Sequence, residues 1–218
     1  MIKLYYVELN DVVDAEVFKQ LLKFVSKDKY EKVKRFHFDI DKKLSLYSEI
    51  LVRTIAYKEL NILNREIIFC RNKYGKPYLK SYPDFHFNLS HTRNAIIVAI
   101  SDKPIGIDIE KIRVADVKIA RRFFTESEVA YIKKARIDMD KRFYEVWTKK
   151  EAYIKFMGKG FSIPLNSFYT LDGDISNQIL TFEKGDYIIS VCNENTNIEC
   201  SIAEFLESDV ESKAMEYL

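Results

Sequence analysis

The strictest alternation of apolar and polar residues lies at positions 105–110, where three isoleucines alternate with Gly106, Asp108 and Glu110. A period of two is typical of a strand with one buried face, so we expect the isoleucines in the core. The opposite face then carries two carboxylates whose Cα atoms are roughly 7 Å apart, and Gly106 leaves a bare position that could admit a ligand. Such a pair could bind a divalent metal, or could simply lie on the solvent side of an ordinary strand.

Hydrophobic periodicity and turn residues predict a mixture of helices and strands before this stretch. The expected elements are a strand at 3–9, a helix through Phe18, a helix capped by Ser26, a long helix at 39–60, and strands at 67–70, 85–89 and 95–100. The last two strands are joined by a polar loop, residues 90–94, which includes Ser90 and His91. This loop could hold a phosphate, or it could be an ordinary polar hairpin.

After Glu110 the pattern changes from strand-like to helical. The expected elements are a helix begun by the capping box at 125–128, a helix at 142–157 ended by Gly158, strands at 168–171, 179–182, 187–192 and 198–205, and a helical or loose tail from 207. Glu151 and Lys155 are four residues apart on the second helix and share a face. A surface ion pair is the simplest explanation for these two residues, and a catalytic pair is the alternative.

A short hinge at Lys103-Pro104 divides the chain near its middle. We therefore predict an α+β protein with two similar α/β lobes in one chain, related by a pseudo-two-fold axis. The N-terminal lobe spans 1–104 and the C-terminal lobe 105–218, and a site between them is expected on general grounds.

Composition narrows the setting of this fold. A chain of 218 residues that is 47% hydrophobic can bury a substantial core. Its 35 Lys and Arg residues nearly balance 33 Asp and Glu, so no nucleic-acid partner is expected. The three cysteines lack zinc-type spacing and are expected to be reduced, and neither a leader nor a membrane span is visible. We expect a cytoplasmic protein without a membrane partner.

Acidic residues from two predicted elements make a candidate metal site. Asp108, Glu110 and Glu151 supply three hard oxygen ligands, which suit Mg²⁺ completed by water and phosphate oxygens. Lysines and His91 would then surround the phosphates.

Four blocks, in this order and at this spacing, carry a resemblance to a known family. They are Tyr74-Gly75-Lys76-Pro77, Phe87-Asn88-Leu89-Ser90-His91, Ile105-Gly106-Ile107-Asp108-Ile109-Glu110 and Trp147-x-x-Lys150-Glu151-x-x-x-Lys155. Together they resemble the surfactin-type 4′-phosphopantetheinyl transferases, over a region from Lys29 to about residue 190. The resemblance implies two similar lobes, with coenzyme A in the cleft between them, in a monomer.

The implied activity is transfer of the phosphopantetheine arm of coenzyme A to a serine of an apo acyl or peptidyl carrier protein, with release of 3′,5′-ADP. By the resemblance, Asp108, Glu110 and Glu151 bind Mg²⁺ and, through it, the diphosphate. Glu151, alone or through a metal-bound water, is the expected base for the serine proton. Lys155 is the expected group that stabilises or protonates the departing phosphate.

The resemblance also implies binding positions for the nucleotide and the carrier protein. Residues expected to contact coenzyme A are Lys29, Lys32, Lys76 and His91 around the nucleotide and its 3′-phosphate, Ser90 at the phosphates and Ser45 near the adenosine. Either Lys42 or Lys43 could point toward the ligand. Carrier docking is expected after Glu110 and at about 158–189, where Ile119, Phe123 and Phe124 serve either docking or core packing.

Two other functions use the same residues. A non-catalytic module that binds coenzyme A or a carrier protein would need the basic positions without the acidic set. A Mg²⁺-dependent hydrolase of nucleotide diphosphates would use both. The type of carrier, from a fatty-acid, polyketide or peptide synthase, stays open.

Overall fold

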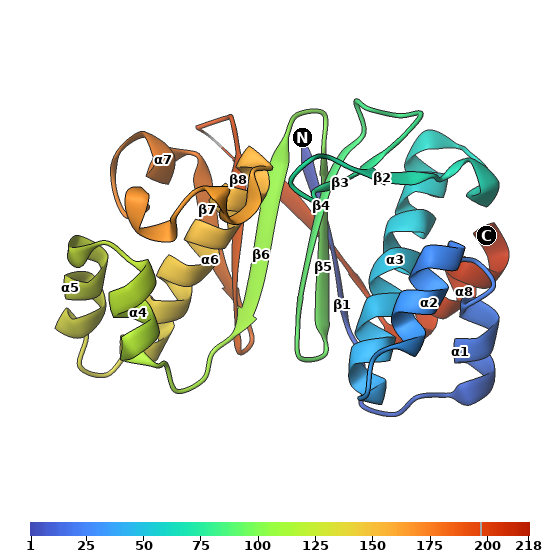
Figure 1. The fold of residues 1–218 in the computed structure, drawn as a ribbon, viewed down its shortest axis with the longest axis horizontal. Coiled ribbons are helices and arrows are strands. Elements are labelled where there is room, and N and C mark those ends of the chain that lie inside the picture. The colour runs from blue at the N-terminus through green and yellow to red at the C-terminus, as the bar shows by residue number, and fades with distance from the viewer. Residues whose placement is uncertain (197) are drawn as a thin grey trace.

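Two sheets pack face to face and helices cover both outer surfaces, as the ribbon in Figure 1 shows for the computed structural model, which describes residues 1–196 and 198–218. The strands are β1 (Ile2–Glu8), β2 (Phe69–Arg71), β3 (Pro77–Leu79), β4 (His86–Thr92), β5 (Ala95–Ser101), β6 (Ile105–Lys111), β7 (Ile179–Lys184), β8 (Tyr187–Asn193) and β9 (Cys200–Phe205). The α-helices are α1 (Ala15–Leu21), α2 (Lys27–Lys34), α3 (Asp39–Leu60), α4 (Val117–Phe123), α5 (Glu126–Lys134), α6 (Met139–Met157), α7 (Gly173–Asn177) and α8 (Glu207–Tyr217).

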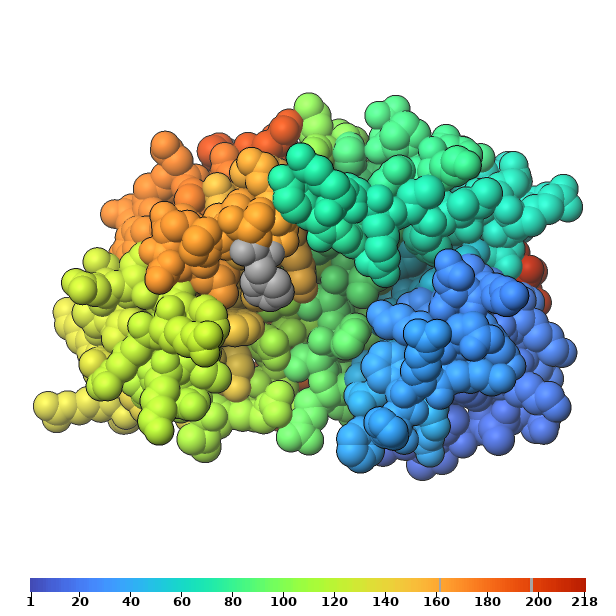
Figure 2. All heavy atoms as spheres, in the orientation of Figure 1, coloured from blue at the N-terminus to red at the C-terminus, as the bar shows by residue number. Residues whose placement is uncertain are grey.

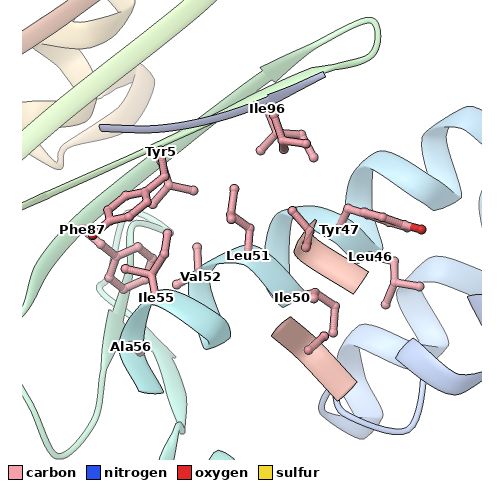
Figure 3. Close-up of a cluster of buried hydrophobic side chains, with 14 of the residues drawn as sticks. Tyr5, Leu46, Tyr47, Ile50, Leu51, Val52, Ile55, Ala56, Phe87 and Ile96 are labelled. Atoms are coloured by element: carbon pink, nitrogen blue, oxygen red, sulfur yellow. The ribbon is translucent and has the colours of Figure 1, made fainter. Parts of the chain in front are cut away.

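The N-terminal sheet has the strand order β4-β5-β1-β9, and α3 packs on its outer face. Both faces of β5 are apolar because both are covered. Ile96 and Val98 face the core beneath α3, whereas Ile97 and Ala99 face the second sheet. Figure 3 shows this core, in which Leu51 of α3 extends toward Ile96, and Ile55 lies near Phe87.

The second sheet has the order β6-β8-β7, and α6 covers its outer face. The three isoleucines of β6 are buried between the two sheets, as the alternation predicts. Each half of the molecule thus has one sheet with one long helix packed upon it. The predicted α+β architecture of two similar lobes is confirmed.

The last strand and helix return to the N-terminal half. Strand β9 pairs in parallel with β1, and α8 packs against α3. Lys43, which is 1% exposed, fixes this return: its Nζ forms an ion pair with Glu207 at 2.7 Å and donates to the carbonyl of Asn10 at 2.8 Å. The division into domains at 1–104 and 105–218 stays a prediction. Residues 200–218 belong to the second of these ranges but pack on the first lobe.

Two local predictions are wrong. The polar loop expected at 90–94 is a turn at Arg93-Asn94 only, because residues up to Thr92 pair with β5. The strand expected at 168–171 does not form. Buried side chains take its backbone groups instead: Lys150 donates to the carbonyl of Phe168 at 2.7 Å, and the amide of Thr170 donates to Glu128 at 3.0 Å.

Two further observations concern the chain as a whole. Cys70, Cys192 and Cys200 are all free thiols. Within the residues that the structure describes, no helix combines the length and apolarity that crossing a membrane requires.

Candidate active site

Strands β4 and β6 lie edge to edge, and side chains at every second position of β4 bridge them. The bridges are Asn88 Oδ1 accepting from the amide of Ile107 at 2.9 Å, Ser90 Oγ donating to Asp108 Oδ1 at 2.8 Å, and Thr92 Oγ1 donating to Glu110 Oε2 at 2.9 Å. Residues 88, 90 and 92 are all polar, and alternate residues of a strand lie on the same face. This period of two in the sequence could have placed all three on one face of β4. Asn88 and Thr92 were not among the predicted site residues.

Gly106 does not admit a ligand, contrary to the expectation from its bare side. A Cβ at Gly106 would lie 2.0 Å from the carbonyl oxygen of Ala152 and 2.3 Å from the amide nitrogen of Phe156. The absence of a side chain lets α6 approach β6 backbone to backbone. This close approach places Glu151 and Lys155 beside the two carboxylates of β6.

Lys155 pairs with Asp108 rather than forming a surface ion pair with Glu151. Its Nζ lies 2.6 Å from Asp108 Oδ1 and donates to Ser90 Oγ at 2.9 Å. The other carboxylate oxygen, Asp108 Oδ2, is buried and has no hydrogen-bond partner among the described residues. Asp108, Ser90 and Lys155 therefore meet in one cluster drawn from three elements.

Negative charge is crowded around Asp108. Burial, together with repulsion from Asp108, raises the pKa of Glu151 to about 7. Burial and the same repulsion also raise the pKa of Glu110. Within the described part of the chain, however, no three or more Asp, Glu, His or Cys side chains converge closely enough to form a ready metal centre.

A cavity of about 630 Å³ opens beside this cluster, between the two halves of the molecule. Figure 2 shows the hollow between the blue N-terminal helices and the yellow-to-orange C-terminal half, with green strand residues at its floor. The predicted site residues that line it are Lys29, Lys32, Ser45, Lys76, His91, Glu151 and Lys155. Ser90 joins them through its hydrogen bond with Lys155.

Cations gather at the N-terminal side of the cavity. Burial and the nearby Lys155, Lys29 and Lys32 lower the pKa of His91, so the imidazole is neutral near pH 7. Lys29 Nζ donates to the carbonyl of Ser45 at 3.1 Å, and burial lowers its pKa despite Glu49 nearby. Lys29 Nζ also lies 3.6 Å from Glu49, which balances part of its charge. Lys32 provides a second ammonium group to an anion in this part of the cavity.

Lys76 lines the cavity but has protein partners of its own. Its Nζ donates to the carbonyls of Ile105 at 2.9 Å and Lys155 at 2.6 Å, which lie at the start of β6 and near the end of α6. Burial lowers the pKa of Lys76 to about 8. The side chain thereby ties the hairpin of β2 and β3 to the C-terminal half.

The choice between Lys42 and Lys43 has a definite structural outcome. Lys43 is buried against Glu207 and the loop at Asn10, as described above, and Lys42 pairs with Asp39 at 2.8 Å. Neither lines the cavity. Arg71 does line it and was not predicted as a site residue. Arg71 ends β2, and its closeness in sequence to the Tyr74–Pro77 block is the signal that could have found it.

Comparison with known proteins agrees with this geometry. Residues 104–204 match the family described as the 4′-phosphopantetheinyl transferase superfamily, and residues 13–103 match the N-terminal family of 4′-phosphopantetheinyl transferases. The chain is 42% identical to the 4′-phosphopantetheinyl transferase gsp of Aneurinibacillus migulanus, covering 78% of this chain and 71% of that protein. The chain belongs to the 4′-phosphopantetheinyl transferase family.

Two Bacillus subtilis relatives are similar over a comparable length. A 4′-phosphopantetheinyl transferase of Bacillus subtilis is 39% identical, covering 76% of this chain and 75% of the relative. The transferase Sfp of strain 168 is 35% identical, covering 80% of each. The chain is therefore an enzyme that transfers phosphopantetheine from coenzyme A to a carrier protein.

Proposed function

We propose that coenzyme A occupies the cavity with its diphosphate at the Asp108 cluster, and that Asp108, Glu110 and Glu151 hold a Mg²⁺ ion there. The observation that carries this proposal is the buried, unpartnered Asp108 Oδ2 among the described residues, next to two carboxyls whose pKa values are raised. Three neighbouring carboxylates that repel one another are a set of oxygen donors that suits Mg²⁺. When bound, Mg²⁺ would supply charge neutralisation for the diphosphate.

The basic residues opposite the carboxylates are assigned to the nucleotide. The 3′-phosphate is proposed to bind where α2 and β4 line the cavity. The residues there are Lys29 and Lys32 of α2 and His91 of β4. Ser45 lies beside Lys29 and is proposed to contact the adenosine. For Lys76, the hydrogen bonds to Ile105 and Lys155 support an anchoring role, and its contact with coenzyme A stays a prediction.

Glu151 is proposed to act as the general base. In the protein without metal, burial and repulsion from Asp108 raise the pKa of Glu151 to about 7, so this carboxylate accepts a proton more readily than an exposed glutamate. The serine Oγ of the carrier protein attacks the β-phosphorus and loses its proton to Glu151, while the bond from that phosphorus to the bridging oxygen breaks. The leaving group is 3′,5′-ADP, and Lys155 stabilises or protonates its departing oxygen.

The carrier protein is proposed to dock on α4 and the residues near it. Ile119 is 37% exposed, and Lys118, Arg121 and Arg122 could attract an acidic carrier. Phe124 is better explained by the core, because it is buried against Phe143 and Trp147. We also propose that the transferase acts as a monomer in the cytoplasm, which agrees with its free thiols.

The rival hydrolase and the non-catalytic module predict different products. Release of 3′,5′-ADP from coenzyme A without a carrier protein would support the hydrolase. Binding of coenzyme A without any transfer to several types of carrier would support the module. For the transferase we expect 3′,5′-ADP to appear only together with the modified carrier.

The metal assignment predicts that Mg²⁺ and coenzyme A bind cooperatively. In calorimetry, Mg²⁺ should tighten coenzyme A binding to the wild type by about tenfold, or about 1.4 kcal/mol. Glu110→Gln should lose most of that gain, because one of the three oxygen ligands becomes neutral. Equal effects of Mg²⁺ on the wild type and Glu110→Gln would remove Glu110 from the metal site.

Coenzyme A binding should also depend on pH through His91. Burial and, after it, the nearby Lys155, Lys29 and Lys32 lower the pKa of His91, and a bound phosphate should raise this pKa by offsetting the lysines. Protonated His91 binds the phosphate more strongly, so affinity should increase as pH falls from about 8 to about 6. Calorimetry in buffers of different ionisation enthalpy measures the proton uptake, and His91→Gln should reduce it. Identical uptake in both proteins would exclude His91 from the phosphate site.

A further inference from the structure

A fully buried ion pair lies next to the proposed base but takes no part in the chemistry above. Glu128 of α5 and Lys150 of α6 have side chains that are 0% exposed, and Lys150 Nζ lies 2.8 Å from Glu128 Oε2. Removing two charges from water is unfavourable unless their remaining hydrogen bonds are satisfied. The partners that satisfy them indicate what the pair holds in place.

Glu128 Oε2 also accepts from the amide of Thr125 at 2.9 Å and from its hydroxyl at 3.0 Å, in the capping box that begins α5. The other partners of the pair lie in the segment that follows α6. Lys150 donates to the carbonyls of Leu165 and Phe168, both at 2.7 Å, and its Nζ lies 4.4 Å from the centre of the Phe168 ring. Glu128 Oε1 accepts from the amide of Thr170 at 3.0 Å and from its hydroxyl at 2.9 Å. The ion pair thus replaces the strand pairing that residues 168–171 lack.

Lys150 also lies opposite the face of α6 that contacts the sheet. Thr148 and Ala152 are on the sheet side: the hydroxyls of Thr148 and Ser190 are 2.8 Å apart, and Ala152 lies against Gly106. A residue two positions away is rotated by about 200° around a helix. Contacts on both sides therefore fix the rotation of α6. Glu151, adjacent to Lys150, lines the cavity.

The held segment begins at the wall of the cavity. Gly158 and Gly160 line the cavity, and the carbonyl of Gly158 accepts from Asn72 Nδ2 at 2.9 Å. From there the chain runs to Leu165, Phe168 and the buried pair. The pair consequently anchors the far end of the segment that forms part of this wall.

We infer that Glu128 and Lys150 are positioning residues for the transfer reaction: they fix the rotation of α6 that presents Glu151 and hold residues 165–170 against it. This inference rests on the proposed role of Glu151. The groups assigned to the 3′-phosphate, Lys29, Lys32 and His91, lie in the N-terminal half. Loss of the pair should therefore lower kcat much more than it raises the KM for coenzyme A.

The test separates positioning from stability by removing one charge and then both. Lys150→Met leaves a buried, unpaired carboxylate and should lower both the Tm and kcat. The double variant Glu128→Gln with Lys150→Met has no unpaired charge, and glutamine can still complete the capping box with Thr125, so its Tm should recover over that of the single variant. Its kcat should stay at least about tenfold below the wild type, because the carbonyls of Leu165 and Phe168 have still lost their donor. Lys141→Met is the control and should keep full activity. Lys141 also lies on α6, but its ion pair with Glu183 is on the surface.

Each outcome decides the inference. A double variant whose kcat recovers together with its Tm would overturn it, because the pair would then act through stability alone. If neither variant folds, Thr170→Val decides, since it keeps the side-chain volume and removes one hydrogen bond: a lower kcat at unchanged KM supports the inference, and an unchanged kcat overturns it. Hydrogen exchange at the Thr170 amide gives a readout that does not depend on Glu151. If the double variant exchanges this amide faster than the wild type while Glu151→Gln stays fully active, Glu151 is not the base. The anchoring of the segment by the ion pair would still be supported.

Discussion

Glu151→Gln is expected to lower kcat by about 10²- to 10⁴-fold, which is the usual contribution of a positioned general base. The glutamine amide keeps the size of the side chain but cannot accept the serine proton. The buried carboxyl has a pKa of about 7, so replacing it by a neutral group should not destabilise the fold. Steady-state kinetics with coenzyme A, Mg²⁺ and an apo carrier protein measure the loss, and thermal unfolding checks the fold.

A matched control for Glu151 lies on the same helix. Glu145 bonds to the hydroxyl of Tyr131 at 3.0 Å and does not line the cavity, so Glu145→Gln should keep nearly full activity. A Glu151→Gln variant that keeps more than about one tenth of the wild-type kcat would show that another group takes the proton. Lys155→Ala tests the second assignment: intact turnover in that variant would remove Lys155 from the role of acid.

Gly106→Ala should disrupt both the fold and the active site, although it adds only one methyl group. The new Cβ would meet backbone atoms of Ala152 and Phe156, which cannot rotate away as a side chain could. Either α6 or β6 must move, and overpacking of this kind lowers the free energy of unfolding by about 3 kcal/mol. A shift of about 1 Å in Glu151 and Lys155 should lower kcat about 100-fold.

Urea unfolding and kinetics together test the Gly106 prediction. Ala203→Val is a suitable control, because it adds methyl groups at an exposed position of β9 and should change neither quantity appreciably. Wild-type stability and activity in Gly106→Ala would mean that α6 does not depend on close contact with β6.

The sequence predicts most of the elements because their signals are local. The long helix was expected at 39–60 and is α3, Asp39–Leu60, and Ser26 caps α2 by accepting from the amide of Lys29. The isoleucines of β6 are buried because alternation alone determines their face. In these cases neighbouring residues in the chain contain the whole physical cause.

Two of the predictions that failed depend on residues distant in the chain. Gly106 suggested room for a ligand, yet the space is filled by α6, about 46 residues later. Residues 168–171 have strand-like composition, but Lys150 and Glu128 satisfy their backbone groups from two helices. Lys43 is basic and near the expected ligand positions, but it is buried because the loop at Asn10 and the returning α8 supply its partners. No local pattern encodes these contacts.

We propose that this transferase uses Glu151, with Asp108 and Glu110, to move phosphopantetheine onto a carrier serine. The most direct test is the intact mass of an apo carrier protein after incubation with the wild-type chain, coenzyme A and Mg²⁺, beside Glu151→Gln and beside a sample with a chelator. We expect a gain of one phosphopantetheine group with the wild type and Mg²⁺, and almost none in the other two. An equal gain with Glu151→Gln would exclude Glu151 as the base, and an equal gain in the presence of the chelator would exclude the metal site.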